Sequence, residues 1–373
     1  MNKIRRTLIA LGLAAVAVLP FLAFGGASVS AAPATIKLKS GGGETGYTVN
    51  AFLPAAATVT TGDTVHWDFP WNEPHTVTFG TPTGDPTVVP SPFPAAPVPY
   101  DGTGSITSGL IGTNFPSAPG TTPGPNAYEV KFTKAGTYNY FCGIHPNMKA
   151  TITVVDSGTV STQAALDATG TADYTTALTA LKAVAAGLAA RPVAVTTRAG
   201  GASEYTLLVS GETDKGDVQQ YFPPAANIKE GDSIVWKNAT HTPHSVTFLP
   251  PPAGDPFAAQ PVKPAGGYAG TGTASSGIIG IGFPNGQGFD MTFTKAGSYP
   301  FICLLHANQG MAGVINVAAA PATPAATATP VAPAPPKTGS GVEESGSAGL
   351  WLVVGVFALA IAVSGMSVAA ARR

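Results

Sequence analysis

The chain has 373 residues, of which 45 are Gly, 35 are Pro and only 10% are charged. Its 44% content of hydrophobic residues excludes disorder throughout, and the many turn-forming residues favour an all-β protein. Nineteen basic residues against twenty acidic ones leave no basic field that would attract a nucleic acid. Two cysteines exclude a disulfide scaffold, which leaves them for a single bridge or for another role.

Residues 1–31 have the order of a secretory signal peptide. A basic start, Met1–Arg6, precedes an apolar run from Leu8 to Phe24, and small residues lead up to Ala31. We expect cleavage after Ala31. A retained membrane anchor is the alternative, because the apolar run is long.

The main part of the chain contains one sequence unit twice. The blocks recur either 169 or 161 positions later: Gly62–Trp67 as Gly231–Trp236, Pro74–Phe79 as Pro243–Phe248, and Phe132–Gly136 as Phe293–Gly297. Tyr100 and Phe115 recur 168 positions later, and the further drop of seven falls in the Pro/Gly-rich loop Ser117–Asn126. Matching blocks with a length change confined to a loop predict two homologous domains, residues 34–156 and 202–317, called here the first and second units.

Each unit contains short β-branched and aromatic segments separated by turn residues, which favours a β-sandwich. In the first unit the predicted strands are Thr64–Phe69, His75–Phe79, Tyr128–Thr133, Thr137–Phe141 and Ala150–Val155. Residues 157–201 join the units. Their Ala/Leu-rich stretch Thr162–Ala190 predicts a helical connector, with a break at Gly170 and an end before Pro192.

In both units two histidines, the single cysteine and one methionine recur in the same order. The eight residues are His75, Cys142, His145 and Met148, then His244, Cys303, His306 and Met311. A trigonal set of two histidines and a cysteine, with a weak axial methionine, is the donor set of a blue copper site. The cysteine ends a strand, the turn presents the histidine, and the methionine lies near the start of the next strand. One short loop therefore supplies three donors.

At these residues both units resemble the cupredoxins, the plastocyanin/azurin family. The loop Cys-x₂-His-Pro-x-Met of the first unit is most similar to amicyanin, and the loop Cys-x₂-His-x₄-Met of the second to plastocyanin and pseudoazurin. The resemblance implies two Greek-key β-sandwiches, each holding one type 1 copper ion with the four donors of its unit as ligands. It also implies that His145 and His306 reach the surface through apolar patches and serve as electron exits.

The C-terminal part reads as an anchor. Residues 348–371 form an apolar run of sufficient length, since about 20 residues span a bilayer. The spacer 318–347 is rich in Ala, Pro and Thr, and its Pro335–Gly339 segment (PPKTG) resembles the sortase sorting signal of Gram-positive-type surface proteins, with Pro335 in place of the usual leucine. Terminal arginines favour the cytoplasmic side. We therefore expect an extracytoplasmic protein at a bacterial cell surface, held by a transmembrane helix or linked to the cell wall.

Several simpler interpretations compete at single residues. A lone Cys-x₂-His is half of many zinc sites, and a Cys142–Cys303 disulfide is open to an extracellular chain. His66 and His241 have no histidine at the matching position of the other unit, so we expect a half-buried or surface His66 and a solvent-facing turn residue at His241. Trp67 and Trp236 are expected in the cores. Thr76 and Ser245 either hydrogen-bond near the thiolates or are ordinary strand residues.

The leading hypothesis is a tethered carrier of electrons between redox proteins, and not an enzyme. Copper storage or delivery without electron transfer is the first alternative. A copper nitrite reductase-like enzyme is the second, but such an enzyme needs a further copper centre built from additional histidines. Once the eight donors are assigned, only His66 and His241 are left for it.

Overall fold

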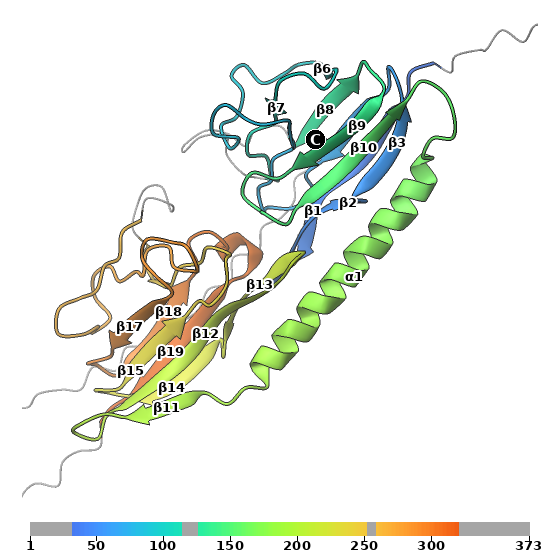
Figure 1. Ribbon diagram of the computed structural model, residues 1–373. Coiled ribbons are helices and arrows are strands. Elements are labelled where there is room, and N and C mark those ends of the chain that lie inside the picture. Colours follow the sequence, from blue (N-terminus) through green and yellow to red (C-terminus); the bar gives the residue numbers. More distant parts are fainter. Residues whose placement is uncertain (1–31, 114–125, 252–258, 321–373) are drawn as a thin grey trace, which may run out of the picture. The chain divides into compact units, whose positions relative to one another are not determined.

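The structure of the protein is a computed structural model that describes residues 32–113, 126–251 and 259–320. A β-rich first unit, one long helix and a β-rich second unit follow each other along these residues (Figure 1). The strands of the first unit are β1 (Thr35–Glu44), β2 (Tyr47–Leu53), β3 (Ala56–Thr60), β4 (Thr64–Asp68), β5 (Thr78–Phe79), β6 (Val98–Tyr100), β7 (Ile106–Thr107), β8 (Ala127–Phe132), β9 (Gly136–Phe141) and β10 (Lys149–Val155). The helix is α1 (Gln163–Ala189).

The second unit repeats the plan of the first. Its strands are β11 (Ala194–Thr197), β12 (Ser203–Thr213), β13 (Gly216–Phe222), β14 (Ala225–Lys229), β15 (Ser233–Lys237), β16 (Thr247–Phe248), β17 (Gly288–Thr292), β18 (Gly297–Ile302) and β19 (Ala312–Ala318). A short 3-10 helix, η2 (Ala307–Gln309), lies between β18 and β19. The described residues are therefore mostly β-sheet with one long helix, which agrees with the all-β prediction.

Three sheets hold these strands together. A large sheet runs β17-β15-β12-β13-β2-β1-β4-β8-β6, with β11 paired to β12, and it belongs to both units. Each unit adds a smaller sheet of its own, β3-β10-β9-β5-β7 in the first and β14-β19-β18-β16 in the second. The residues buried in each unit form one core, in which Trp67 and Trp236 are fully buried, as predicted.

The repeated Gly-Asp pairs are turns that tie strands together. Gly62 and Gly231 have φ of 97° and 89°, a conformation that glycine adopts without strain. The Asp63 carboxylate accepts hydrogen bonds from the backbone amides of Ala34 and Thr60, each at 2.7 Å. Asp232 does the same in the second unit. The repeat therefore reflects a structural turn and has no direct part in the metal chemistry.

The two units join edge to edge through β2 and β13. Thr48 pairs with Asp217, which occupies the same position in the second repeat. Around this pair the backbone bonds are reciprocal, because Asn50 donates to the Lys215 carbonyl at 2.8 Å and Gln219 donates to the Gly46 carbonyl at 2.9 Å. Such self-complementary pairing is how two copies meet about a two-fold axis in a symmetric dimer. Here both copies belong to one chain.

Helix α1 crosses this junction and does more than connect the units. Its buried residues Ala177, Leu181 and Ala185 form an apolar cluster with Val49 of β2 and Val218 of β13. The Thr162 side chain caps its first turn by accepting from Ala165 N at 3.3 Å, and it ends before Pro192, as expected. The junction is thus covered by a helix as well as paired by strands.

Two local predictions were wrong. The helix is not broken at Gly170, where the glycine lets it approach the β2 backbone, since a Cβ would stand 3.0 Å from the Leu53 carbonyl carbon. The predicted strand His75–Phe79 shortens to Thr78–Phe79. The amides of Thr76 and Val77 donate to the Cys142 sulfur and the Ser108 hydroxyl instead of to a neighbouring strand.

Candidate metal centres

The loop between β9 and β10 closes on itself through backbone hydrogen bonds. Cys142 follows the last residue of β9 and donates its amide to the Met148 carbonyl at 2.9 Å. Met148 in turn donates to the His145 carbonyl at 2.9 Å. In the second unit Cys303 and Met311 are joined in the same way at 3.1 Å, with η2 taking up the extra residues. Each loop therefore holds its cysteine, histidine and methionine at fixed positions.

In the first unit the distant histidine completes a group of three donors. His75 is fixed by reciprocal backbone bonds to Ile111, at 2.8 and 2.9 Å. Its Nδ1 lies 3.1 Å from His145 Nδ1 and 3.9 Å from the Cys142 sulfur, and His145 Nδ1 lies 3.5 Å from that sulfur. A triangle of this size has room for one ion about 2 Å from each donor, which is a normal metal–ligand bond length.

The second unit reproduces this triangle. His244 Nδ1 and His306 Nδ1 are 3.0 Å apart, and they lie 3.8 and 3.4 Å from the Cys303 sulfur. Within the part of the chain that the structure describes, these two groups are the sets of histidine, cysteine and carboxylate atoms close enough to hold a metal ion. The fold thus brings together, in two groups of three, six of the eight donor residues predicted from the sequence.

The two methionines lie beside the groups in the cores. Met148 is 1% exposed and belongs to the buried cluster of Cys142, and Met311 is fully buried in the cluster of Cys303. A thioether in such a place meets no solvent. Such burial fits an axial thioether ligand, and that role stays a prediction for both methionines.

The environment of both cysteines favours the thiolate. Burial alone would raise the pKa of Cys142, but the imidazoles of His145 and His75 hold this pKa well below its usual value. The pKa of Cys303 is held well below its usual value in the same way by His306 and His244. Both cysteines are free, so the disulfide alternative fails. Thiolate and imidazole together suit a copper ion in either oxidation state.

The residues after the first histidines act through their backbones. Thr76 N donates to the Cys142 sulfur at 3.3 Å, and Ser245 N donates to the Cys303 sulfur at 3.4 Å. Their hydroxyls point elsewhere and accept hydrogen bonds, at 2.8 Å each, from the amide that follows the cysteine. The expected hydrogen bond near the thiolate exists, but the side chain serves to fix the loop.

On the side away from the sulfur atoms, one carboxylate contacts both groups. Glu73 Oε1 lies 3.6 Å from His145 Nε2, and Glu73 Oε2 lies 3.3 Å from His306 Nε2. Gln219 of β13 also donates to Glu73 Oε2, at 3.2 Å. Burial would raise the pKa of Glu73, but hydrogen bonds to the two histidines hold it well below the usual value. Burial alone would lower the pKa of His145, but the Cys142 thiolate and Glu73 raise this pKa to about 10.

A second buried carboxylate, Asp217, lies at the interface. Asp217 is fully buried, accepts from Asn50 at 3.2 Å, and lies 4.0 Å from His244 Nε2. Burial and the charge of Glu73 raise the pKa of Asp217. His75 Nε2 faces Gly41, where any Cβ would overlap it. Gly41 therefore makes the space that the His75 ring occupies.

Sequence reasoning missed these interface residues. Glu73, Asp217 and Gln219 lie outside the donor pattern, and their counterparts in the other repeat are Thr242, Thr48 and Asn50. The sequence offered one signal, an acidic residue two positions before the ligand histidine in the first unit only. The role of this residue depends on the pairing of the two units, which brings it to the second histidine group.

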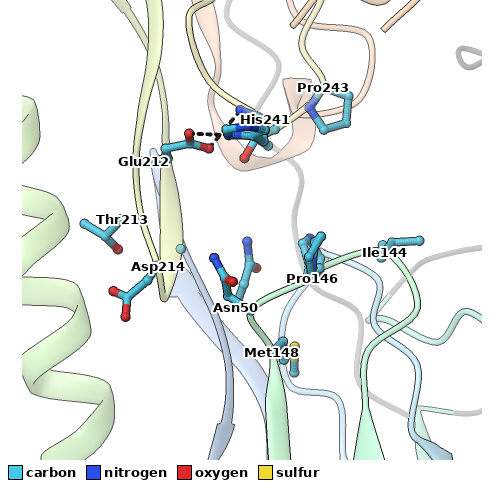
Figure 2. A pocket seen from close by; sticks show the side chains of 13 residues that line it. Asn50, Ile144, Pro146, Met148, Glu212, Thr213, Asp214, His241 and Pro243 are labelled. Atoms are coloured by element: carbon cyan, nitrogen blue, oxygen red, sulfur yellow. Dashed lines mark hydrogen bonds and ion pairs between the residues drawn. The ribbon is translucent and has the colours of Figure 1, made fainter. Parts of the chain in front are cut away.

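The two loop histidines differ in exposure. The side chain of His145 is 14% exposed, whereas that of His306 is 3% exposed. The expectation that both reach the surface is therefore wrong for His306, because the first unit covers it. His145 lines a cleft of about 570 Å³. Figure 2 shows His241 and Pro243 on one side of this cleft and Ile144 and Pro146 on the other.

The last two histidines lie apart from the donor groups. His66 is 18% exposed and contacts Glu129 at 2.7 Å and Asp68 at 3.0 Å. His241 is 70% exposed and contacts Glu212 at 2.9 Å (Figure 2). Both positions agree with the prediction of surface or half-buried residues.

The expected targeting and anchoring segments fall outside the described residues. These are the signal peptide at 1–31, most of the spacer at 318–347 and the apolar run at 348–371. Among the helices that the structure describes, none is long and apolar enough to cross a membrane.

Comparisons with known proteins agree with the two donor groups. A family model described as copper binding proteins of the plastocyanin/azurin family matches residues 42–155 and 208–318. Plastocyanin from Scenedesmus fuscus is 34% identical over 122 residues, which cover 32% of this chain and 97% of that protein. Chloroplastic plastocyanin from Oryza sativa subsp. indica is 32% identical over 136 residues, which cover 36% of this chain and 76% of that protein.

Two solved structures are also similar to parts of the chain. The oxidized form of plastocyanin from Dryopteris crassirhizoma is 26% identical with a TM-score of 0.21, and the match covers 32% of this chain and 99% of that one. A Cu(I) structure of an amicyanin mutant is 21% identical with a TM-score of 0.21, and the match covers 32% of this chain and 82% of that one.

Proposed function

Because the chain belongs to the plastocyanin/azurin family of copper-binding proteins, we propose that it is a two-copper electron carrier that works at a cell surface. The observation that carries this proposal is the duplicated triangle of two imidazole nitrogens and one thiolate sulfur. Copper bound by such donors changes between Cu(I) and Cu(II) with little rearrangement of its ligands. The chain has two copper-binding domains with one such site in each.

The ligands proposed for the two ions follow the sequence pattern. In the first domain they are His75, Cys142, His145 and Met148, and in the second they are His244, Cys303, His306 and Met311. The Nδ1 and sulfur separations of 3.0 to 3.9 Å support the trigonal set. Burial of both methionines beside the cysteines supports a weak axial thioether in each site. The rigid loops hold these donors ready for either oxidation state.

The polar contacts of the leftover histidines favour a carrier over an enzyme. A nitrite reductase-like centre needs further histidines at one place, but His66 and His241 pair with separate carboxylates. Among the described residues, neither histidine joins a third donor group. Electron transfer between redox proteins therefore remains the function proposed here.

The proposed location rests on the two ends of the sequence. Residues 1–31 have the pattern of a signal peptide, and residues 335–339 with the following apolar run have the pattern of a surface anchor. Copper delivered outside the cytoplasm would then load both sites, and a redox partner would dock from the same compartment.

Metal analysis and optical titration test this function. We expect two copper ions per chain, the intense visible band of a copper–thiolate bond, and its reversible loss on reduction. Copper uptake without that band, while both cysteines are reduced, would refute the proposal. Copper storage predicts uptake as well, but with no reversible potential and no exchange with a redox partner.

A further inference from the structure

The histidines of the two metal groups meet at Glu73. Each loop histidine has Nδ1 on the sulfur side, so Nε2 lies on the opposite side of the ring. His145 Nε2 and His306 Nε2 both point at this carboxylate, at 3.6 and 3.3 Å from its two oxygens. Glu73 is 6% exposed, and Gln219 of the second unit fixes it from β13. One side chain of the first unit is therefore in contact with both groups.

A metal ion bound at Nδ1 would strengthen this arrangement. When Nδ1 of an imidazole binds a metal ion, the proton stays on Nε2, and such a ring usually donates this N–H to a carboxylate. His145 and His306 would donate to different oxygens of Glu73. The counterpart of Glu73 in the second repeat is Thr242, so this connection occurs once in the pseudo-symmetric interface.

Solvent reaches the two groups unequally. In the second unit the side chain of His306 is 3% exposed and that of His244 is fully buried. In the first unit His145 lines the cleft together with Ile144 and Pro146. A redox partner can thus approach the first loop histidine but not the second.

We propose that His145, Glu73 and His306 form an internal electron relay through which the second copper site exchanges electrons only by way of the first. The relay rests on the proposed function. With copper bound in both sites, one electron would leave Cu(I) in the first domain, which would become Cu(II), and would enter Cu(II) in the second, which would become Cu(I). No bond forms or breaks, and no proton moves between groups. Electron tunnelling weakens steeply across empty space. Between the two rings, the Glu73 carboxylate leaves only two gaps, of 3.6 Å to His145 Nε2 and 3.3 Å to His306 Nε2.

Single-site variants of the full, copper-loaded chain test this order. Hexaammineruthenium(II), a one-electron outer-sphere reductant, is mixed with Cys142→Ser or Cys303→Ser, and bleaching of the remaining visible band is followed in time. The relay predicts that Cys303→Ser keeps fast reduction of the first site. It predicts that Cys142→Ser loses fast reduction of the second site. Equally fast reduction of both variants would overturn the relay.

Glu73 itself is tested in the chain with both sites. Glu73→Ala removes the bridging atoms, so the slower part of the bleaching, assigned to the second site, is expected to lose rate. Glu73→Gln keeps those atoms and is expected to restore most of the rate. Glu44→Gln changes a carboxylate that pairs with Lys182, outside the cleft and both donor groups, and it serves as the matched control. An unchanged second phase in Glu73→Ala would overturn the proposal.

These outcomes separate the relay from the function beneath it. A chain whose sites show no reversible blue band fails as an electron carrier, whatever its kinetics. A chain with two reversible sites that are reduced independently keeps the proposed function and loses only the relay.

Discussion

The two metal centres have the same donors in the same order, but they differ in their surroundings. In the first centre, His145 borders a cleft, and the loop has the shorter spacing between histidine and methionine. In the second, the interface between the domains covers His306. The two centres share their donors because each loop supplies three of the four. Their access to solvent differs because different residues lie against the two loops.

The largest effect is expected from removing a thiolate. Cys142→Ser and Cys303→Ser should each lower tightly bound copper from two ions per chain to one, since serine offers no soft donor. Metal analysis after dialysis measures this loss, with the double variant as the zero point. Retention of two tightly bound ions in either variant would contradict the assignment of that cysteine.

Loosening the junction should reduce the difference between the centres. Leu181 of α1 is fully buried over β2 and β13, and Leu181→Ala should lower the free energy of unfolding by about 2–5 kcal/mol. Thr179→Ala, on the exposed face of the same helix, is the control. Denaturant titration measures the effect, and reduction of the second site should become faster. A variant as stable as the control would show that the helix does not support the junction.

Gly41 faces His75, and each of Gly41 and its counterpart Ser210 can be replaced by the residue of the other repeat. Gly41 has φ of 75°, and its counterpart Ser210 has φ of 66° with a side chain present. Gly41→Ser should cost about 1–3 kcal/mol of stability through backbone strain, and it should displace His75. Competition with a copper chelator should then show weaker binding in the first site only. Ser210→Gly should leave copper binding in the second site unchanged, and equal weakening of both sites would contradict this account.

The smallest effect concerns pH and the first domain alone. Burial lowers the pKa of His66, but Glu129 and Asp68 raise it above the usual value, whereas Val235 holds this position in the second domain. Because the pKa of His66 is higher in the folded state, the protonated ring stabilises the folded chain at pH values below the pKa of the unfolded state. This stabilisation is lost as the pH rises through the pKa of the folded state. His66→Gln should therefore cost about 0.5 kcal/mol near pH 6 and almost nothing near pH 9. Unfolding of the copper-free chain at both pH values measures it, and an equal cost at both would be inconsistent with the ion pairs.

The sequence predicted those parts of the site that lie close together in one loop or recur in both repeats. Cys142, His145 and Met148 lie within seven residues, and His75 stands at a matching position in each unit. Glu73 and Gln219 acquire their role only when β2 pairs with β13, and no local pattern marks that edge. The break expected at Gly170 failed for the same reason, because glycine permits close packing on Leu53, a contact between distant segments.

Electron paramagnetic resonance of the fully oxidised, copper-loaded chain tests the central claim most directly. Two copper sites whose loop histidines share Glu73 should give a spectrum split or broadened by magnetic interaction between two Cu(II) ions. The spectra of Cys142→Ser and Cys303→Ser should each show one isolated type 1 ion. A wild-type spectrum equal to the sum of the two variants, with no interaction, would contradict the paired arrangement of the sites.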